Sequence, residues 1–124
     1  MDIFEAILYL TLNIYHEARS ENRMGQLAVA HVTLNRSEEK GLSVKEVVFE
    51  PYQFSWTHLI GEDNYKPKDM KAWNNCLKSA LIAIKQPDFT VGSTYYHHEN
   101  IDPYWTKNFR FIGQYGKHKF YREK

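Results

Sequence analysis

The residues best suited to chemistry lie near the start of the chain, in the stretch Tyr15-His16-Glu17-Ala18-Arg19-Ser20-Glu21. Before them, apolar side chains recur at helical spacing, namely Ile3, Ala6, Ile7, Leu10 and Ile14. Glu17 follows Ile14 by three residues, so a continued helix keeps its carboxyl group near the buried stripe. A carboxyl group beside apolar and aromatic surface loses hydration of its charged form, which raises its pKa and suits a general acid. The alternative is that Glu17 forms a surface ion pair with Arg19 or simply marks the end of the helix.

Several other kinds of chemistry fit the sequence poorly. The zinc-protease pattern His-Glu-x-x-His begins at His16 but meets Ser20 where the second histidine belongs. Ser55 lacks the Gly-x-Ser-x-Gly elbow of a nucleophilic serine, and Cys76 falls beside an apolar helical stripe, where an inert thiol is expected. The six glycines are scattered, which disfavours a phosphate-cradling loop. We therefore expect no metal site, no cofactor and no bound nucleotide.

Cleavage of a glycosidic bond is the reaction that remains. It needs a proton donor for the leaving oxygen and a way to stabilise or trap a cationic sugar. Glu17 can be the donor. Glu21, Glu99 and Asp102 are candidates for a second carboxylate, and the sequence does not rank them. A cleavage in which the substrate's own groups trap the cation needs no second carboxylate.

Aromatic side chains are abundant, because nine Tyr, seven Phe and three Trp form 15% of the chain. A sugar-binding cleft lined with flat side chains is one use of this supply, and a well-filled core is the other. From residue 52 to residue 57, polar and aromatic residues alternate, which predicts an extended segment. One face of this segment would carry the neutral hydrogen-bonding side chains of Gln53, Ser55 and Thr57. The other face would carry the aromatic anchors Phe54 and Trp56.

Three long helices are predicted, over residues 2–17, 26–39 and from 67 to a point before Pro87. A short helical turn is predicted over residues 44–49. Lys40-Gly41 is a stop signal for the second helix. Ser43 and Glu46 form a capping box for the short turn, and Pro67 suits the start of the last helix.

Strand-forming residues are concentrated at the end of the chain. The expected extended segments are 92–98, 109–112 and 117–122, with Gly113-Gln114-Tyr115-Gly116 as a hairpin turn and 103–105 as a loop. Helices first and short strands last predict an α+β fold in one domain, residues 1–124. His97 and His98 would point to opposite faces of a strand, so at most one of them could meet His118 at a metal.

Charge and cysteine content limit the partner and the compartment. The formal net charge of +1 argues against a protein built to hold polyanions, although the residues after Pro103 include six basic side chains and only Glu123 as an acid. This basic tail could contact a nucleic acid or an anionic wall polymer, and a solvated face is the alternative. Cys76 has no second cysteine to pair with. Asp2 and Glu5 stand where a signal peptide carries basic residues, so we expect no export signal, and no apolar run is long enough to span a bilayer.

Taken together, short motifs along the chain resemble the catalytic domain of the SleB and CwlJ type cell-wall hydrolases, which include spore-cortex-lytic enzymes and phage lysins. The matching pieces are residues 15–21, Gly25-Gln26-Leu27-Ala28-Val29-Ala30, Leu34-Asn35-Arg36, Gln53-Phe54-Ser55-Trp56, Gly92-Ser93-Thr94-Tyr95-Tyr96-His97, the loop 103–105, Ile112-Gly113 and His118-Lys119-Phe120-Tyr121. They follow the family order over about nine tenths of the chain, with Ser20 where many relatives carry glycine.

The resemblance implies a lysozyme-like α+β fold, with three main helices followed by a short antiparallel sheet. It implies a peptidoglycan-degrading glycosidase that cuts between N-acetylmuramic acid and N-acetylglucosamine, with Glu17 as the catalytic acid. We expect a lytic transglycosylase that leaves 1,6-anhydro ends. The alternatives are an N-acetylmuramidase that uses a second carboxylate and a non-catalytic glycan-binding module.

We expect hydrogen bonds to the substrate from Gln53, Ser55 and Tyr95. Stacking surfaces for the sugar rings are expected from Tyr96, Trp56 and Trp105. His97 either orients one of these groups or is a satisfied structural histidine, and Asn35 and Arg36 are expected to tie down backbone carbonyls. The expected partner is the peptidoglycan glycan strand and not a nucleic acid. We expect a monomeric phage or prophage endolysin that stays in the cytoplasm, without membrane insertion, until a separate membrane-permeabilising protein releases it.

Overall fold

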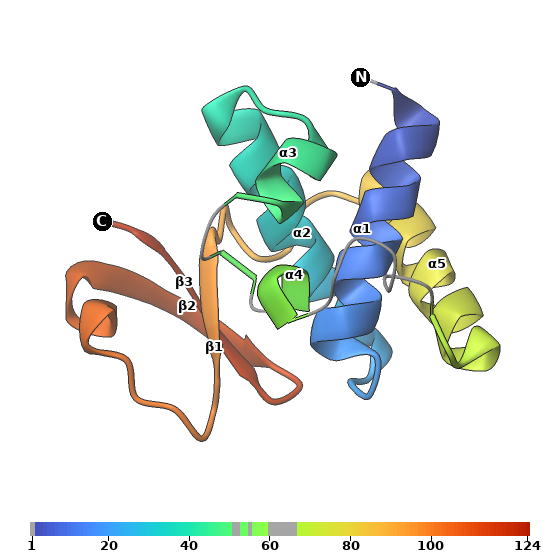
Figure 1. Cartoon of the computed structure of the whole chain (residues 1–124). Coiled ribbons are helices and arrows are strands. Elements are labelled where there is room, and N and C mark those ends of the chain that lie inside the picture. The colour runs from blue at the N-terminus through green and yellow to red at the C-terminus, as the bar shows by residue number, and fades with distance from the viewer. Residues whose placement is uncertain (1, 51–52, 55, 60–66) are drawn as a thin grey trace.

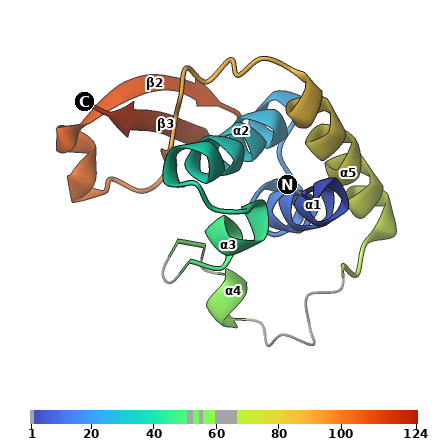
Figure 2. The ribbon, with the colours of Figure 1, turned by 90° about the horizontal axis from the view of Figure 1, so that it is seen from above.

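The computed structural model describes residues 2–50, 53–54, 56–59 and 67–124, arranged as a helical half and a sheet half (Figure 1). The long helices are α1 (Ile3–Ala18), α2 (Arg23–Lys40) and α5 (Met70–Lys85), and each packs against the other two. Seen from above, α1 lies between α5 and the short helix α3 (Val44–Val48), while the sheet lies on the side of α2 away from α5 (Figure 2). No described helix is long and apolar enough to cross a bilayer.

Helix α1 forms as the apolar spacing predicted. The Asp2 carboxylate caps its first turn by accepting the backbone N–H groups of Phe4 and Glu5 at 3.0 and 3.2 Å. The helix continues to Ala18 and closes with a backbone bond from the Glu21 N–H to the Ala18 carbonyl. Glu17 therefore lies in the last turn of α1, with its backbone fixed by the helix.

Helix α2 starts earlier than predicted. The expected start was Gln26, but α2 begins at Arg23 because the Asn22 side chain accepts the Gly25 N–H at 2.8 Å and caps the helix. Its end matches the prediction, since Gly41 follows Lys40 with a left-handed φ of 66°. The additional turn brings Gly25 and Gln26 inside the packed helix, where both are buried.

The segment after α3 contradicts the prediction of an extended run over 52–57. α3 itself carries the predicted capping box between Ser43 and Glu46. Trp56, however, begins a short helix, α4 (Trp56–Leu59). Both the Thr57 N–H and the Thr57 hydroxyl bond to the Phe54 carbonyl, at 3.3 and 2.9 Å, and this local turn competes with strand geometry. Ser55 lies outside the described residues.

Helix α5, in contrast to α2, begins after its predicted start. Pro67 precedes the helix, and the Asp69 side chain caps it by accepting the Ala72 N–H at 3.0 Å. The helix ends at Lys85, before Pro87, as predicted. Cys76 is fully buried on its inner face, as predicted, and burial raises the pKa of the thiol to about 11, which disfavours the reactive thiolate.

The three strands form one antiparallel sheet in the order β1-β3-β2. Their bounds are β1 (Tyr95–His98), β2 (Phe109–Tyr115) and β3 (His118–Glu123). β2 and β3 make the predicted hairpin, but β2 extends through most of the expected turn to Tyr115, while β3 begins at His118, one residue later than predicted, so only Gly116 and Lys117 connect the strands. Gly116 has a φ of 62° and a Cβ added there would meet the Glu21 carboxylate at 3.0 Å, which explains the glycine. The predicted loop around Trp105 contains a 3-10 helix, η2 (Tyr104–Asn108).

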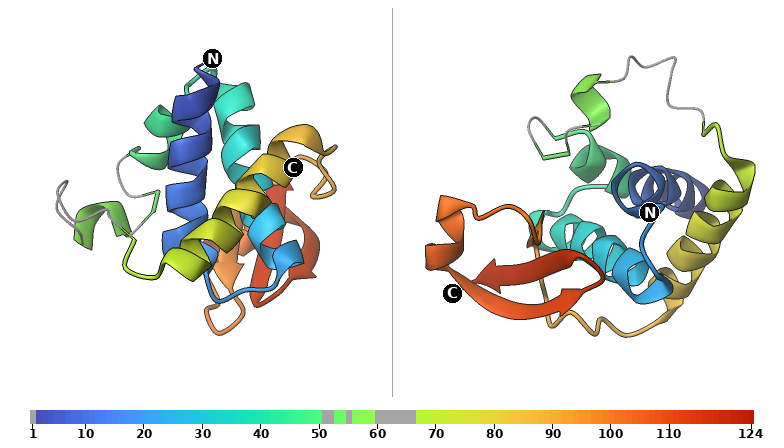
Figure 3. Two further views of the ribbon diagram at one scale, coloured as in Figure 1. Left: turned by 90° about the vertical axis from the view of Figure 1, so that its right-hand side faces the viewer. Right: turned by 90° about the horizontal axis from the view of Figure 1, so that it is seen from below.

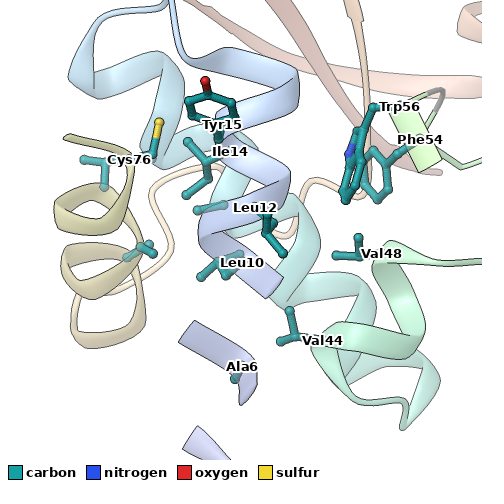
Figure 4. Close-up of a cluster of buried hydrophobic side chains, with 14 residues drawn as sticks. Ala6, Leu10, Leu12, Ile14, Tyr15, Val44, Val48, Phe54, Trp56 and Cys76 are labelled. Carbon is teal, nitrogen blue, oxygen red and sulfur yellow. The ribbon is translucent and has the colours of Figure 1, made fainter. Parts of the chain in front are cut away.

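Two groups of buried apolar side chains hold these elements together. The larger one lies among the helices, and Figure 4 shows Phe54 and Trp56 together near α3, with Cys76 across α1 on α5. The smaller one joins Phe120 of β3 to Val29 and Val32 of α2. Helix α2 therefore connects the two halves of a structure whose α+β class is as predicted.

Candidate active site

Glu17 is carried by α1, whose inner face is buried in the core, and is itself half-buried. Its neighbour Ala18 is buried, whereas Arg19 and Ser20 are exposed, so the carboxyl group marks the edge between core and surface. Arg19 does not offer the expected alternative partner, because it donates to the Tyr15 carbonyl at 3.4 Å and lies over the Tyr15 ring. The Tyr15 hydroxyl in turn accepts the Lys68 N–H at 3.2 Å, on the α5 side of the helix.

The partner of Glu17 comes from the sheet. The Tyr96 hydroxyl donates a 2.6 Å hydrogen bond to Oε1 of Glu17, across 79 residues of sequence. Tyr96 lies in β1 opposite Phe120, on the face of the sheet that packs on α2, and contacts both groups of buried side chains. Burial and the neighbouring Glu17 raise the pKa of Tyr96 well above its usual value, so the phenol keeps its proton and acts as a donor.

Burial raises the pKa of Glu17 above the ordinary glutamate value of 4.5. The hydrogen bond from Tyr96 and the positive charge of Arg36 act in the opposite direction, and burial outweighs them. Because Oε1 accepts the Tyr96 proton, the acidic proton of a neutral Glu17 belongs on Oε2. The arrangement is that of a general acid with one oxygen anchored and the other carrying the proton.

The segment that contains Gln53 and Trp56 adjoins this helix turn. The Trp56 indole N–H donates to the Asn13 side chain at 2.8 Å, and the ring stacks on His16 at 4.4 Å. Trp56 is only 5% exposed, so its ring is packed against α1 one residue before Glu17 in the sequence. Gln53 is half-buried in the turn before it. Their contact with substrate stays a prediction.

Strand alternation separates the remaining predicted site residues from Tyr96. Tyr95 and His97 project to the opposite face of β1, where Trp105 lies 5.6 and 5.7 Å from their rings. Both His97 nitrogens have partners, the His98 carbonyl at 2.8 Å and the Tyr121 hydroxyl at 2.9 Å. Sequence reasoning grouped Tyr95, Tyr96 and His97 together, whereas only Tyr96 reaches Glu17.

The candidates for a second carboxylate are held elsewhere. Glu21 accepts the Lys117 N–H at 2.8 Å and lies 3.1 Å from Nδ1 of His118, at the turn between β2 and β3. From below, this turn lies next to the connection between α1 and α2 (Figure 3, right). Glu99 accepts a 2.8 Å bond from Gln114 and is exposed, as is Asp102.

No three metal-ligand side chains gather anywhere in the described part of the chain. His98 lies opposite His118 in the sheet, with ring centroids 5.7 Å apart, while His97 faces the other side, as the strand period predicted. Burial lowers the pKa of His118, so this imidazole is neutral beside Glu21 at neutral pH.

Asn35 and Arg36 were expected to tie down carbonyls, and they do. Asn35 donates to the Ser93 carbonyl at 2.9 Å, and Nε of Arg36 donates to the Thr94 carbonyl at 2.6 Å, just before β1. Sequence reasoning missed the charge that Arg36 directs at Glu17. A signal was present, because Arg36 continues the buried stripe of α2 that contains Val29 and Val32, where a cation is unusual.

Comparisons with known proteins identify the family of the chain. A family model described as Cell Wall Hydrolase matches residues 20–121, a span that begins just after Glu17. The spore cortex-lytic enzyme of Halalkalibacterium halodurans is 34% identical over 110 residues, which are 86% of this chain and 32% of that enzyme. This chain therefore spans about a third of the length of that relative.

Two solved structures have the same fold. The catalytic domain of the germination-specific lytic transglycosylase SleB from Bacillus anthracis has a TM-score of 0.78 at 30% identity, over 94% of this chain and 93% of that one. The catalytic domain of the Bacillus cereus SleB protein has a TM-score of 0.76 at 30% identity, over 95% and 91%. The fold is the lysozyme-like α+β fold of these catalytic domains. The chain belongs to the cell wall hydrolase family.

Proposed function

We propose that this chain cuts the glycan strand of peptidoglycan between N-acetylmuramic acid and N-acetylglucosamine, as a lytic transglycosylase. The observation that carries the proposal is the half-buried Glu17, whose raised pKa and single anchored oxygen suit a proton donor. The likeness to a lytic transglycosylase catalytic domain over 94% of the chain supports the same reaction.

The proposed reaction has two proton transfers and one acid/base. Oε2 of neutral Glu17 first gives its proton to the glycosidic oxygen as the bond from that oxygen to the muramic acid C1 breaks. The C6 hydroxyl of the same sugar then bonds to C1 and gives its proton to the Glu17 carboxylate. The products are a free N-acetylglucosamine end and a 1,6-anhydro end, and Glu17 is neutral again. Tyr96 holds Oε1 throughout, which keeps the carboxyl group oriented in both steps.

The contacts of the other carboxylates support transglycosylation over hydrolysis. An N-acetylmuramidase needs a second carboxylate free to act on water or on the sugar. Glu21 is engaged by Lys117 and His118, and Glu99 is engaged by Gln114. Two of the three candidate carboxylates are thus engaged within the chain, and the third, Asp102, is exposed in the loop after β1. The engagement of Glu21 and Glu99 supports a single acid/base.

The setting of an endolysin is a further part of the proposal. The apolar run of α1 forms a core helix that carries Glu17, since Ala6, Leu10 and Ile14 are buried, and this supports a role of the run in the fold. We propose a monomer held in the cytoplasm until a membrane-permeabilising protein releases it. Expression in a bacterial cytoplasm would then lyse cells only after the membrane is permeabilised, and lysis without that treatment would contradict the proposal.

Mass spectrometry of digested, purified peptidoglycan tests the reaction. Transglycosylation predicts fragments with anhydro-muramic ends, which are lighter than hydrolysed ends by one water. Reducing muramic ends would show hydrolysis and bring a second carboxylate into the mechanism. A chain that sediments with cell walls yet releases no fragments would be a glycan-binding module, and the enzyme proposal would fail.

A further inference from the structure

Arg36 is a buried cation in the interior of the molecule. It is 6% exposed and lies in the second half of α2, on the helix face that is buried against the sheet. Burying a guanidinium group is costly unless its charge and its donors are compensated. The partners of Arg36 therefore indicate what the charge does.

The hydrogen bonding of Arg36 is incomplete among the described residues. Its Nε donates to the Thr94 carbonyl at 2.6 Å, and the guanidinium carbon lies 5.1 Å from the Tyr95 ring and 5.3 Å from the Phe54 ring. Its Nη1 is buried and meets no hydrogen-bond acceptor in the described part of the chain. The group is thus fixed in place by one bond and two aromatic faces, with donor capacity left over.

The charge of Arg36 is also not consumed by an ion pair with a described carboxylate. Glu50, one of the two acidic groups that act on Arg36, is bound to Lys40 at 3.0 Å. The other acidic group is Glu17, whose bonded partner is the neutral phenol of Tyr96. Arg19, the residue that follows α1, lies over the Tyr15 ring instead.

The ionisable groups around this pair come from four elements. Tyr95 and Tyr96 of β1, Glu50 after α3 and Glu17 of α1 all act on Arg36. From the sheet, the His118 ring lies edge-on to Tyr96 at 5.1 Å, with its own pKa lowered by burial. Of these groups only Arg36 carries a permanent positive charge.

We propose that Arg36 is a positioning residue of the site: it fixes the start of β1 so that Tyr96 reaches Glu17, and it supplies a buried positive charge that stabilises the Glu17 carboxylate. The first part follows from the bond to Thr94, which lies two residues before Tyr96. The second part follows from the uncommitted charge. The catalytic consequence rests on the proposed function, in which Glu17 must pass through its ionised form between the two proton transfers.

The direction of the electrostatic effect is defined. Burial raises the pKa of Glu17, and the Arg36 charge opposes that rise. Without the charge, Glu17 would remain protonated to a higher pH, and the carboxylate formed during cleavage would be less stable. A balance between these two influences keeps the group able both to give and to retake a proton near the working pH.

Titration of the Glu17 carboxyl carbon by NMR in the intact chain, labelled with carbon-13 glutamate, tests the electrostatic part. The Glu17 signal is assigned by its loss in Glu17→Gln. We expect the midpoint to move to higher pH in Arg36→Gln and to stay close to that of the parent in Arg36→Lys, which keeps the charge. Arg36→Met, of similar length and apolar, replaces Arg36→Gln if the latter does not fold.

Asn35→Ala is the matched control, because Asn35 binds the neighbouring Ser93 carbonyl and carries no charge. It should loosen the same segment without removing a charge, so any shift of the Glu17 midpoint should be clearly smaller than in Arg36→Gln. An unchanged midpoint in both neutral Arg36 variants, or an equal shift in Asn35→Ala, would overturn the proposal and leave Arg36 with a structural role only.

Rates of peptidoglycan cleavage then test the catalytic consequence. We expect Arg36→Gln to lose about tenfold or more in rate near neutral pH, with Arg36→Lys in between, from loss of orientation and of charge. The titration needs no substrate, so a chain that fails to cleave peptidoglycan would refute the proposed function while the titration still decides the role of Arg36.

Discussion

Glu17 and Glu21 stand four residues apart at the end of α1, and their surroundings differ in kind. Glu21 accepts a backbone N–H from Lys117 and lies 3.1 Å from Nδ1 of His118, so its side chain joins the β2–β3 turn to the helices. Glu17 receives one hydrogen bond, from Tyr96, in a place where burial disfavours its charge.

The contacts of each carboxyl group, and not its burial alone, therefore distinguish the structural role of Glu21 from the proposed proton-donor role of Glu17. A carboxylate that holds a backbone N–H of another element stabilises a fold, because removing it leaves that donor without a partner. A carboxyl group that is short of donors holds a proton instead and can pass it to a substrate. Each prediction below either sharpens this contrast or removes it.

Replacing Glu17 should have the largest effect, and on activity. Glu17→Gln keeps the size of the side chain and an oxygen for Tyr96 but removes the transferable proton. We expect the rate of peptidoglycan cleavage to fall by about a hundredfold or more, with folding retained by circular dichroism. A variant that clears purified walls at the parent rate would remove Glu17 from the mechanism.

Tyr96→Phe should have the second largest effect. It removes the only described hydrogen bond to Glu17 while keeping the ring against Phe120. Loss of a bond to a charged group predicts a rate lower by about ten- to a hundredfold. The pKa of Glu17 should rise, because this bond lowers it, so the alkaline side of the pH–rate profile should move to higher pH.

Tyr115→Phe provides the control for that measurement. Tyr115 also packs on Phe120, but from β2 and without a bond to Glu17. Its removal of a hydroxyl group should leave the profile in place. If both variants shifted the profile equally, the shift would report on the sheet as a whole and not on Tyr96.

Glu21→Ala should affect stability more than activity. The Lys117 N–H and the His118 ring lose their shared partner, which predicts a loss of about 1 to 2 kcal/mol in unfolding free energy, measured by urea denaturation. Glu99→Ala, which removes one exposed bond to Gln114, should cost no more than about 0.5 kcal/mol. Loss of cleavage in folded Glu21→Ala as deep as in Glu17→Gln would instead identify Glu21 as a second catalytic carboxylate.

The smallest effect concerns the stability of Glu17→Gln. Because the pKa of Glu17 is raised in the folded state, the folded chain holds this proton above pH 4.5, where the unfolded chain has released it. The contribution of Glu17 to stability therefore falls as the pH rises through that window. Glutamine has no charge to bury, so the variant should melt slightly above the parent at neutral pH, and the difference should vanish below pH 4.5. A lower melting temperature at pH 7 would contradict the raised pKa.

The helical half was largely predictable, because local signals determine it. The apolar period located α1 and the position of Glu17 in its last turn, and Gly41 and Ser43 marked helix ends correctly. The errors at helix starts have one cause. The starts were predicted at Gln26 and Pro67, whereas side-chain caps from Asn22 and Asp69 determine where the helices begin.

The site itself was only partly predictable. Strand alternation could have separated Tyr96 from Tyr95 and His97, but which face of β1 meets Glu17 depends on pairing with β3 and on packing against α2. The local turn at Thr57 was missed because its bond to Phe54 competes with an alternating pattern that is typical of strands. Arg36 was recognised as a backbone anchor, whereas its charge acts on a residue of another helix.

The most direct test of the central claim is the pH dependence of kcat/KM for glycan cleavage, which reports on ionisation of the free enzyme. The account predicts a descending limb set by Glu17, centred above the ordinary glutamate value of 4.5 and absent from the residual rate of Glu17→Gln. A limb centred at or below 4.5, or one that persists unchanged in Glu17→Gln, would contradict it.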